Sequence, residues 1–270
     1  MVVQHNLSAM NTNRQMGVVT SALQKSTEKL SSGYKINRAG DDAAGLSISE
    51  KMRSQIRGLN KASDNAQDGI SLIQVAEGAL NETHSILQRM NELATQAAND
   101  TNTSVDRQSI KDEIEQLNEE LDRISTTTQF NKQDLLTGGF SGKLQVGALE
   151  GQTMDVKISL AVSANGLKVS AVEVSTNVKA GDAMQSIQDA IESVSKQRSK
   201  LGAIQNRLEH TINNLDTNAE NTQAAESRIR DTDMADEMVQ YSKNNILSQA
   251  GQSMLAQANQ QTQGVLSLLG

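Results

Sequence analysis

The clearest pattern along the chain is a helical repeat of apolar residues between positions 73 and 97. Eight positions spaced by three or four residues form one seam, and seven of them are apolar: Ile73, Ala76, Leu80, Thr83, Leu87, Met90, Ala94 and Ala97. A second apolar line recurs every seventh residue beside this seam, so the stripe is wider than a two-stranded coiled coil requires. The pattern predicts a long helix with several packing neighbours.

Two further helices are predicted by the same spacing. After a polar break at 99–102, apolar residues recur from Ile110 to Ile124 at intervals of four and three. A short polar connection favours an antiparallel return of this second helix along the first. Beyond Gly181, an apolar residue stands at every seventh position from Ile187 to Leu215. The three helices are expected to form one bundle.

The segment between the second and third predicted helices has a different pattern. Apolar residues alternate with smaller or polar ones from Met154 to Val162, which is typical of a half-buried strand. Asn165-Gly166 is a strong two-residue hairpin signal, and the alternation resumes with Leu167. We therefore expect a mainly α fold: an elongated helical bundle or coiled coil with a small β-hairpin element at about 142–176, and paired N- and C-terminal helices.

Both ends of the chain lack charged residues. None precedes Arg14 and none follows Lys243, yet a helical apolar pattern runs on to the last residues. Such weakly apolar ends bury too little surface on their own to offset the entropy of ordering them. We expect them to be buried against something else, and the candidate tail-packing residues are Leu7, Met10, Leu247, Met254, Val265 and Leu268.

Charge predicts that the two terminal arms lie side by side. Between Arg14 and Lys61 there are nine basic against four acidic residues, and between Glu209 and Glu237 two basic against eight acidic. Opposite charges on segments that flank one bundle favour contact between them. The hypothesis is an antiparallel pair, which crosslinks between residues 30–60 and 210–240 would test.

Composition excludes several classes of function. The net charge of −7 and the four aromatic residues in 270 argue against binding to nucleic acid. Cysteine is absent, which excludes disulfides and thiolate metal sites, and His5, His84 and His210 stand far apart without a metal-binding spacing. No nucleophile and base can be paired from the spacing, so neither an enzyme nor a cofactor or metal site is expected.

No apolar stretch approaches the roughly 20 residues needed to span a bilayer, and the first residues lack the pattern of a cleaved signal peptide. We therefore expect no membrane insertion. Proline, which kinks or breaks helices, is also absent, so long uninterrupted helices are possible throughout the chain.

Residues 30–46 (LSSGYKINRAGDDAAGL) closely resemble the signature of bacterial flagellins. Further segments that fit the family pattern lie at 65–71, 77–80, 205–208, 225–231 and 256–261. The chain resembles a short flagellin that lacks the variable outer domains. The resemblance implies a terminal helical domain at the filament's inner core, 1–42 plus 232–270, and an elongated helical domain, 43–231, that carries the β element.

The resemblance also implies a function and partners. A flagellin is exported to the bacterial flagellum without a cleaved signal peptide and polymerises with other flagellin subunits into the filament used for motility. The expected partners are an export chaperone at the C-terminal end, the filament cap and hook-junction proteins, and Toll-like receptor 5 of hosts. The alternatives are a hook-filament junction protein, or a secreted receptor ligand that does not polymerise.

The family's receptor-binding surface matches Arg89, Leu93 and Glu113 in this sequence. Arg89 and Leu93 lie one helical turn apart, so a guanidinium and an apolar side chain are expected to be presented together. The alternative is that Leu93 belongs to the bundle seam. Gly40–Gly45 has the length of a phosphate loop, but it lacks the lysine, and its Asp41 and Asp42 are expected to cap the helix that follows.

Overall fold

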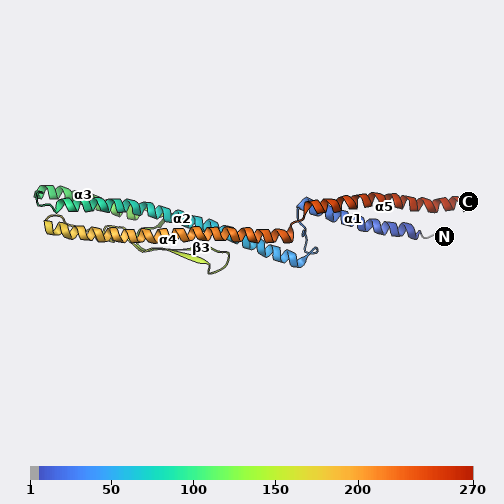
Figure 1. Cartoon of the computed structure of the whole chain (residues 1–270), viewed down its shortest axis with the longest axis horizontal. Helices are drawn as coiled ribbons and strands as arrows, with labels where there is room; N and C mark the ends of the chain where they lie inside the picture. The colour runs from blue at the N-terminus through green and yellow to red at the C-terminus, as the bar shows by residue number, and fades with distance from the viewer. Residues whose placement is uncertain (1–5, 270) are drawn as a thin grey trace. The chain divides into compact units, whose positions relative to one another are not determined.

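The computed structural model describes the backbone of residues 6–269 and the side chains of residues 6–261. In chain order the elements are α1 (Leu7–Ser32), α2 (Ala43–Ala97), α3 (Ser104–Thr127), β1 (Gln129–Phe130), β2 (Gln133–Asp134), β3 (Phe140–Gln145), β4 (Thr153–Ile158), α4 (Asn177–Arg230) and α5 (Met234–Leu269) (Figure 1). The mainly α fold is confirmed. The chain forms two compact units, residues 1–54 with 221–270 and residues 55–220, which we call the terminal unit and the central unit.

The central unit is built on the predicted helical seam. Ile73, Leu80, Leu87 and Met90 of α2 are all fully buried. They belong to one cluster with the buried faces of α3 and α4, including Ile114, Leu121, Ile187, Val194 and Leu201. The chain contains no tryptophan, and this core is almost entirely aliphatic. Apolar residues recur every seven positions in the sequence because only one face of each helix packs into the core.

Helix α3 begins at a signal that the local sequence supplies. The Thr103 hydroxyl accepts a hydrogen bond from the backbone N–H of Asp106, and the Asp106 carboxylate accepts one from the backbone N–H of Thr103. This reciprocal arrangement satisfies two backbone donors that the first helical turn leaves unpaired. It fixes where the chain re-enters a helix after the polar break at 99–102, so that α3 returns along α2.

The β hairpin is present, but its predicted turn is wrong. β3 pairs antiparallel with β4, from Phe140 opposite Ile158 to Gln145 opposite Thr153. Asn165-Gly166 instead lies in a compact loop in which the backbone N–H of Leu167 donates to the carbonyl of Ser163 at 2.9 Å. These local bonds replace a strand ladder, and the Asp122 carboxylate holds the loop by accepting from the N–H of Ala164 at 2.8 Å.

Two side-chain hydrogen bonds attach the hairpin to α2 and α4, and a glycine of α2 makes room for it. Asn65 of α2 donates from Nδ2 to the carbonyl of Gln145 at 3.1 Å, and Gln197 of α4 donates from Nε2 to the carbonyl of Lys157 at 3.3 Å. A Cβ at Gly69 would lie 2.3 Å from Cδ1 of Leu144. Glycine at this position therefore leaves room for the Leu144 side chain of β3 to pack directly on the backbone of α2.

In the terminal unit, α1 and α5 run antiparallel along each other (Figure 1). At one end Nδ2 of Asn6 donates to the carbonyl of Ala258 at 3.0 Å, and at the other Lys29 pairs with Glu237 at 3.4 Å. The antiparallel pairing predicted from charge is confirmed. Among the described residues, no helix is long and apolar enough to cross a membrane.

Candidate functional site

The contact between α1 and α5 is a narrow seam in which small and polar side chains alternate with half-buried larger apolar ones. Its half-buried or buried positions repeat at intervals of three and four on both helices: Ala9, Thr12, Met16, Val19, Leu23, Ser26 and Leu30 on α1, and Glu237, Tyr241, Asn244, Ser248, Gly251, Leu255 and Ala258 on α5. On α1 the buried residue is a serine, Ser26. The seam has coiled-coil spacing, but it encloses no apolar core comparable to that of the central unit.

The predicted tail-packing residues lie outside this seam. Leu7 is 72% exposed, Met10 65%, Leu247 44% and Met254 58%. Further exposed apolar side chains of the two helices are Val18, Met234, Met238, Val239 and Ile246. The side chains of Val265 and Leu268 lie outside the described residues. A monomeric protein gains nothing by exposing so many apolar side chains on one helix pair, and such surfaces mark interaction sites.

The exposed apolar residues of α5 point in more than one direction. Val239 and Ile246 are seven residues apart and form one line along the helix, and Leu247 and Met254 form a second. Adjacent positions on a helix are about 100° apart, so the two lines face different sides. Together the two lines form an exposed apolar stripe that extends over about 100° of the helix surface.

A backbone clasp joins the two chain segments that follow α1 and α4. Gly33 caps α1 in the left-handed region, with φ of 77°. The backbone N–H of Lys35 donates to the carbonyl of Arg230 at 2.7 Å, and that of Thr232 donates to the carbonyl of Gly33 at 3.0 Å. These bonds make Tyr34 and Asp231 an isolated antiparallel bridge. The clasp fixes the two segments beside each other within the terminal unit.

Arg230 closes the clasp with its side chain. The Arg230 side chain is only 13% exposed, and its guanidinium lies 2.5 Å from the Glu50 carboxylate and 4.9 Å from the centroid of the Tyr34 ring. The hydrogen bond from Arg230 is the main cause that lowers the pKa of Glu50 below its ordinary value. Sequence reasoning missed this arrangement, because the three residues lie far apart in the chain and follow no periodic pattern.

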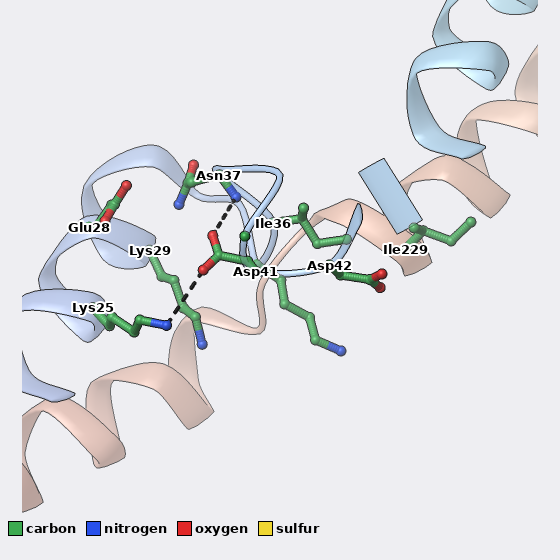
Figure 2. A pocket seen from close by; sticks show the side chains of 10 residues that line it. Lys25, Glu28, Lys29, Ile36, Asn37, Asp41, Asp42 and Ile229 are labelled. Carbon is green, nitrogen blue, oxygen red and sulfur yellow. Dashed lines mark hydrogen bonds and ion pairs between the residues drawn. The ribbon is translucent and has the colours of Figure 1, made fainter. Parts of the chain in front are cut away.

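Beside the clasp lies a hollow of about 260 Å³, shown in Figure 2. The carboxylate of Asp41 accepts hydrogen bonds from the backbone N–H groups of Arg38 and Asn37, at 3.1 and 3.3 Å, and pairs with Lys25 at 3.6 Å. The bond from Arg38 is the largest cause that lowers the pKa of Asp41. The Asp41 carboxylate ties the loop to α1 and places a negative charge in the hollow, which disfavours binding of a phosphate there.

The predicted capping role of the Asp pair is confirmed for Asp42. Its Oδ1 accepts a hydrogen bond from the N–H of Gly45 in the first turn of α2, at 2.9 Å. A Cβ at Gly45 would lie 2.5 Å from Oδ2 of Asp42. The GDDAAG motif is therefore a helix start with a tightly packed cap, and Asp41 ties the preceding loop to α1.

The expected receptor-contact residues lie on α2 and α3. Arg89 donates from Nε and NH2 to one oxygen of Glu113, at 3.0 and 2.9 Å, and both side chains are about half exposed. Leu93 is only 2% exposed and belongs to the core. The expectation that Leu93 is presented beside Arg89 is wrong, and the alternative that it belongs to the bundle seam is confirmed. Leu93 faces the core because it lies on the same line of α2 as Leu72, Ala79 and Ile86, at intervals of seven residues.

The histidines form no site within the described part of the chain. His84 is partly buried and hydrogen-bonds through Nε2 to Gln88 at 3.0 Å, whereas His210 is exposed. His5 lies outside the described residues. No group of three or more candidate metal-binding side chains comes together among residues 6–261.

These features define a class of protein. The chain has a central unit with its own core and a terminal helix pair whose apolar surface it cannot cover, and such a chain is a subunit of a larger assembly. Residues 3–141 match the family described as "Bacterial flagellin N-terminal helical region", and residues 184–269 match "Bacterial flagellin C-terminal helical region".

Full-length relatives agree with this match. The chain is 56% identical to a flagellin of Halalkalibacterium halodurans over 271 aligned residues, and 51% identical to a flagellin of Bacillus subtilis strain 168 over 304. Both alignments cover 100% of this chain and 100% of the relative. The chain belongs to the bacterial flagellin family. It is a structural subunit of the bacterial flagellum that polymerises into a filament of identical subunits, and it is not an enzyme.

Solved structures show the same fold. The crystal structure of Bacillus cereus flagellin is 32% identical in sequence with a TM-score of 0.51, covering 60% of this chain and 94% of that chain. A putative flagellar hook-associated protein from Vibrio parahaemolyticus has a TM-score of 0.61 at 14% identity, covering 71% of this chain and 100% of that chain. The second likeness concerns the fold alone. Sequence identity above 50% over the whole chain favours the flagellins over the hook-junction alternative.

Proposed function

We propose that the terminal helices α1 and α5 are the polymerisation element of this flagellin and reach their final packing only between neighbouring subunits. The observation that carries the proposal is the exposure of Leu7, Met10, Leu247 and Met254 on a helix pair whose seam residues are mostly only half-buried. In the filament, neighbouring copies supply the surface that these side chains lack. Residues 1–42 and 232–270 then form the inner wall of the filament.

A contact of this kind is heterologous, because the surface that covers the helix pair differs from the surface that the pair itself presents. Heterologous contacts that do not close into a ring generate open helical polymers. Folding of the ends is linked to assembly, because a partner that binds only the folded form stabilises it by mass action. A subunit whose ends order late can pass through a narrow export channel, and polymerisation is confined to the growing tip.

Export and capping partners follow from the family resemblance. The apolar pattern from Val239 to the C-terminus is the segment that a dedicated export chaperone holds before secretion through the flagellar export apparatus. The filament cap and the hook-junction proteins meet the subunit at the two ends of the filament. The uncharged, glutamine-rich C-terminal end supports burial of this segment by a protein surface, because it carries no charge to desolvate.

The test of polymerisation is electron microscopy of the purified full chain after seeding or salting-out, with limited proteolysis of the free and assembled protein. We expect long filaments, and we expect cleavage near both termini in the free subunit but protection of the same sites in the filament. Protein that stays monomeric under conditions where a known flagellin assembles would contradict the proposal and favour a junction protein or a receptor ligand.

A second function, recognition of the monomer by Toll-like receptor 5, is favoured by one observation. Arg89 and Glu113 form an exposed ion pair that connects α2 and α3 at the positions matching the family's receptor surface. We expect the double substitution Arg89→Ala with Glu113→Ala to weaken binding of the monomer to the receptor at least tenfold, which corresponds to about 1.4 kcal/mol. The matched control is Lys111→Ala with Glu115→Ala, a neighbouring ion pair on α3, and unchanged affinity of the first variant would refute the assignment.

A further inference from the structure

Helix α3 carries a stripe of acidic residues on its exposed face. The stripe comprises Asp112, Glu115, Glu119 and Asp122, spaced by three and four residues, and all four are exposed. Asp112 and Asp122 also accept hydrogen bonds within the chain, from Gln108 and from the N–H of Ala164. At a rise of about 1.5 Å per residue it is about 15 Å long. Within the described part of the chain Glu119 has no ion-pair partner, and Glu115 pairs only with Lys111 of its own helix, at 3.6 Å.

Helix α4 carries a matching basic stripe. Its three basic residues, Lys196, Lys200 and Arg207, and Ala203 between them are exposed and spaced by four, three and four residues, and at about 1.5 Å per residue they extend over about 16 Å. Lys196 pairs with Glu192 of its own helix, but no described carboxylate lies within 4.0 Å of Lys200 or Arg207. Lys200, Ala203 and the partly buried Ile204 line a hollow of about 420 Å³ together with Asp155, Lys157 and Ser159.

The two stripes cannot meet within one chain. Helices α3 and α4 both start at the end of the central unit where α2 finishes, because Arg107 donates to the carbonyl of Ala97 and Asn177 donates to the carbonyl of Ala98. They therefore run in the same direction. The acidic stripe begins eight residues into α3, whereas the basic stripe begins nineteen residues into α4. This difference displaces the stripes by about 16 Å along the bundle.

We propose that the acidic stripe of α3 packs along the basic stripe of α4 in a neighbouring subunit of the filament. This inference rests on the polymerisation proposed above and names the charged surfaces that join the central units. Two copies in the same orientation, shifted along the filament axis, bring parallel stripes of similar length and opposite charge together. Glu119 of one subunit then faces Ala203 of the next, between Lys200 and Arg207.

The physical role of this contact is to set the register between subunits. Single exposed ion pairs contribute little to stability, between about 0 and 1 kcal/mol each. Complementary charge chiefly selects the correct partner orientation, since a misplaced register brings like charges together. The contact repeats in every subunit, and added salt screens it because the pairs are near the surface.

Crosslinking tests the contact directly, because the chain contains no cysteine. Subunits with Glu119→Cys are co-assembled with subunits with Ala203→Cys and treated with a bismaleimide that spans about 8–10 Å, the usual distance between packed helices. We expect covalent dimers on a denaturing gel from the mixed filaments, and none from either single variant. Glu150→Cys, an exposed site outside both stripes, replaces Glu119→Cys in the control and should give no dimers.

Charge reversal gives an independent measurement. We expect Lys200→Glu with Arg207→Glu to raise the lowest protein concentration that supports filament growth about tenfold, and the further changes Glu115→Lys and Glu119→Lys to restore it. Lys132→Glu with Lys143→Glu, two exposed residues outside the stripes, is the control of equal charge. Thermal unfolding of each monomer verifies its fold.

Two results together would overturn the stripe contact while leaving polymerisation intact. Filaments would form normally but give no dimers between positions 119 and 203, and Lys200→Glu with Arg207→Glu would assemble as well as Lys132→Glu with Lys143→Glu. Absence of filaments from the unmodified chain would instead contradict the proposed function itself.

Discussion

Removal of residues 1–30 and 245–270 is expected to abolish filament formation completely and to leave a soluble, helical monomer. The deletion takes away nearly all of α1 and more than half of α5, and with them Leu7, Met10, Leu247 and Met254. It leaves the core of the central unit untouched, because that cluster lies between residues 66 and 208. Folding of the central unit and polymerisation therefore depend on different parts of the chain.

The measurement is electron microscopy of the trimmed and full-length proteins after identical seeding, with circular dichroism of both monomers. We expect the trimmed protein to keep strong helical signal and a cooperative thermal transition. The full-length chain from the same preparation is the control for assembly. Filaments built from the trimmed protein would exclude the terminal helices as the polymerisation element, and loss of the thermal transition would show that the central unit does not fold independently of them.

Leu80→Ala is expected to have the largest effect of any single substitution considered for the central unit. Leu80 is fully buried in the middle of α2, within the cluster formed with α3 and α4. Truncation of a buried leucine removes apolar contacts and leaves a cavity, which costs about 2–5 kcal/mol of unfolding free energy. For a unit of this size each kcal/mol lowers the melting temperature by about 2–4 °C.

Val75→Ala is the matched control on the same helix. Val75 is 43% exposed and faces away from the cluster, so we expect a change below about 1 kcal/mol. Both variants are compared with the parent monomer by denaturant unfolding and thermal melting. Equal destabilisation by the two substitutions would mean that the seam read from the sequence is not the core of the central unit.

The candidate site was only partly predictable. The uncharged ends and the opposite charges of the two arms predicted an antiparallel helix pair with tail-packing residues, and both follow from one-dimensional patterns of charge and hydropathy. The clasp of Arg230, Glu50 and Tyr34 could not be found in this way, because 180 residues separate the two members of its ion pair. A contact between residues so far apart depends on how the helices return along each other.

The β element shows where local signals fail. Asn165-Gly166 is a strong turn signal, and the chain does turn there, but the strands pair across the loop at 146–152 instead. Burial of Leu167 against the core and the hydrogen bond from the Ala164 N–H to the Asp122 carboxylate outweigh the local preference. Leu93 shows the same limit, since one helical turn separates it from Arg89 but the packing of α2 decides which of them meets solvent.

The sequence by itself determined the helices, their apolar faces, the aliphatic core and the antiparallel terminal pair, because each depends on the period of apolar residues or on the net charge of a segment. The tertiary structure alone decided the strand partners, the burial of Leu93, the Arg230 clasp and the displacement between the stripes of α3 and α4. Each of these depends on the relative placement of residues distant in the chain, and that placement is set by packing within the units rather than by any local pattern.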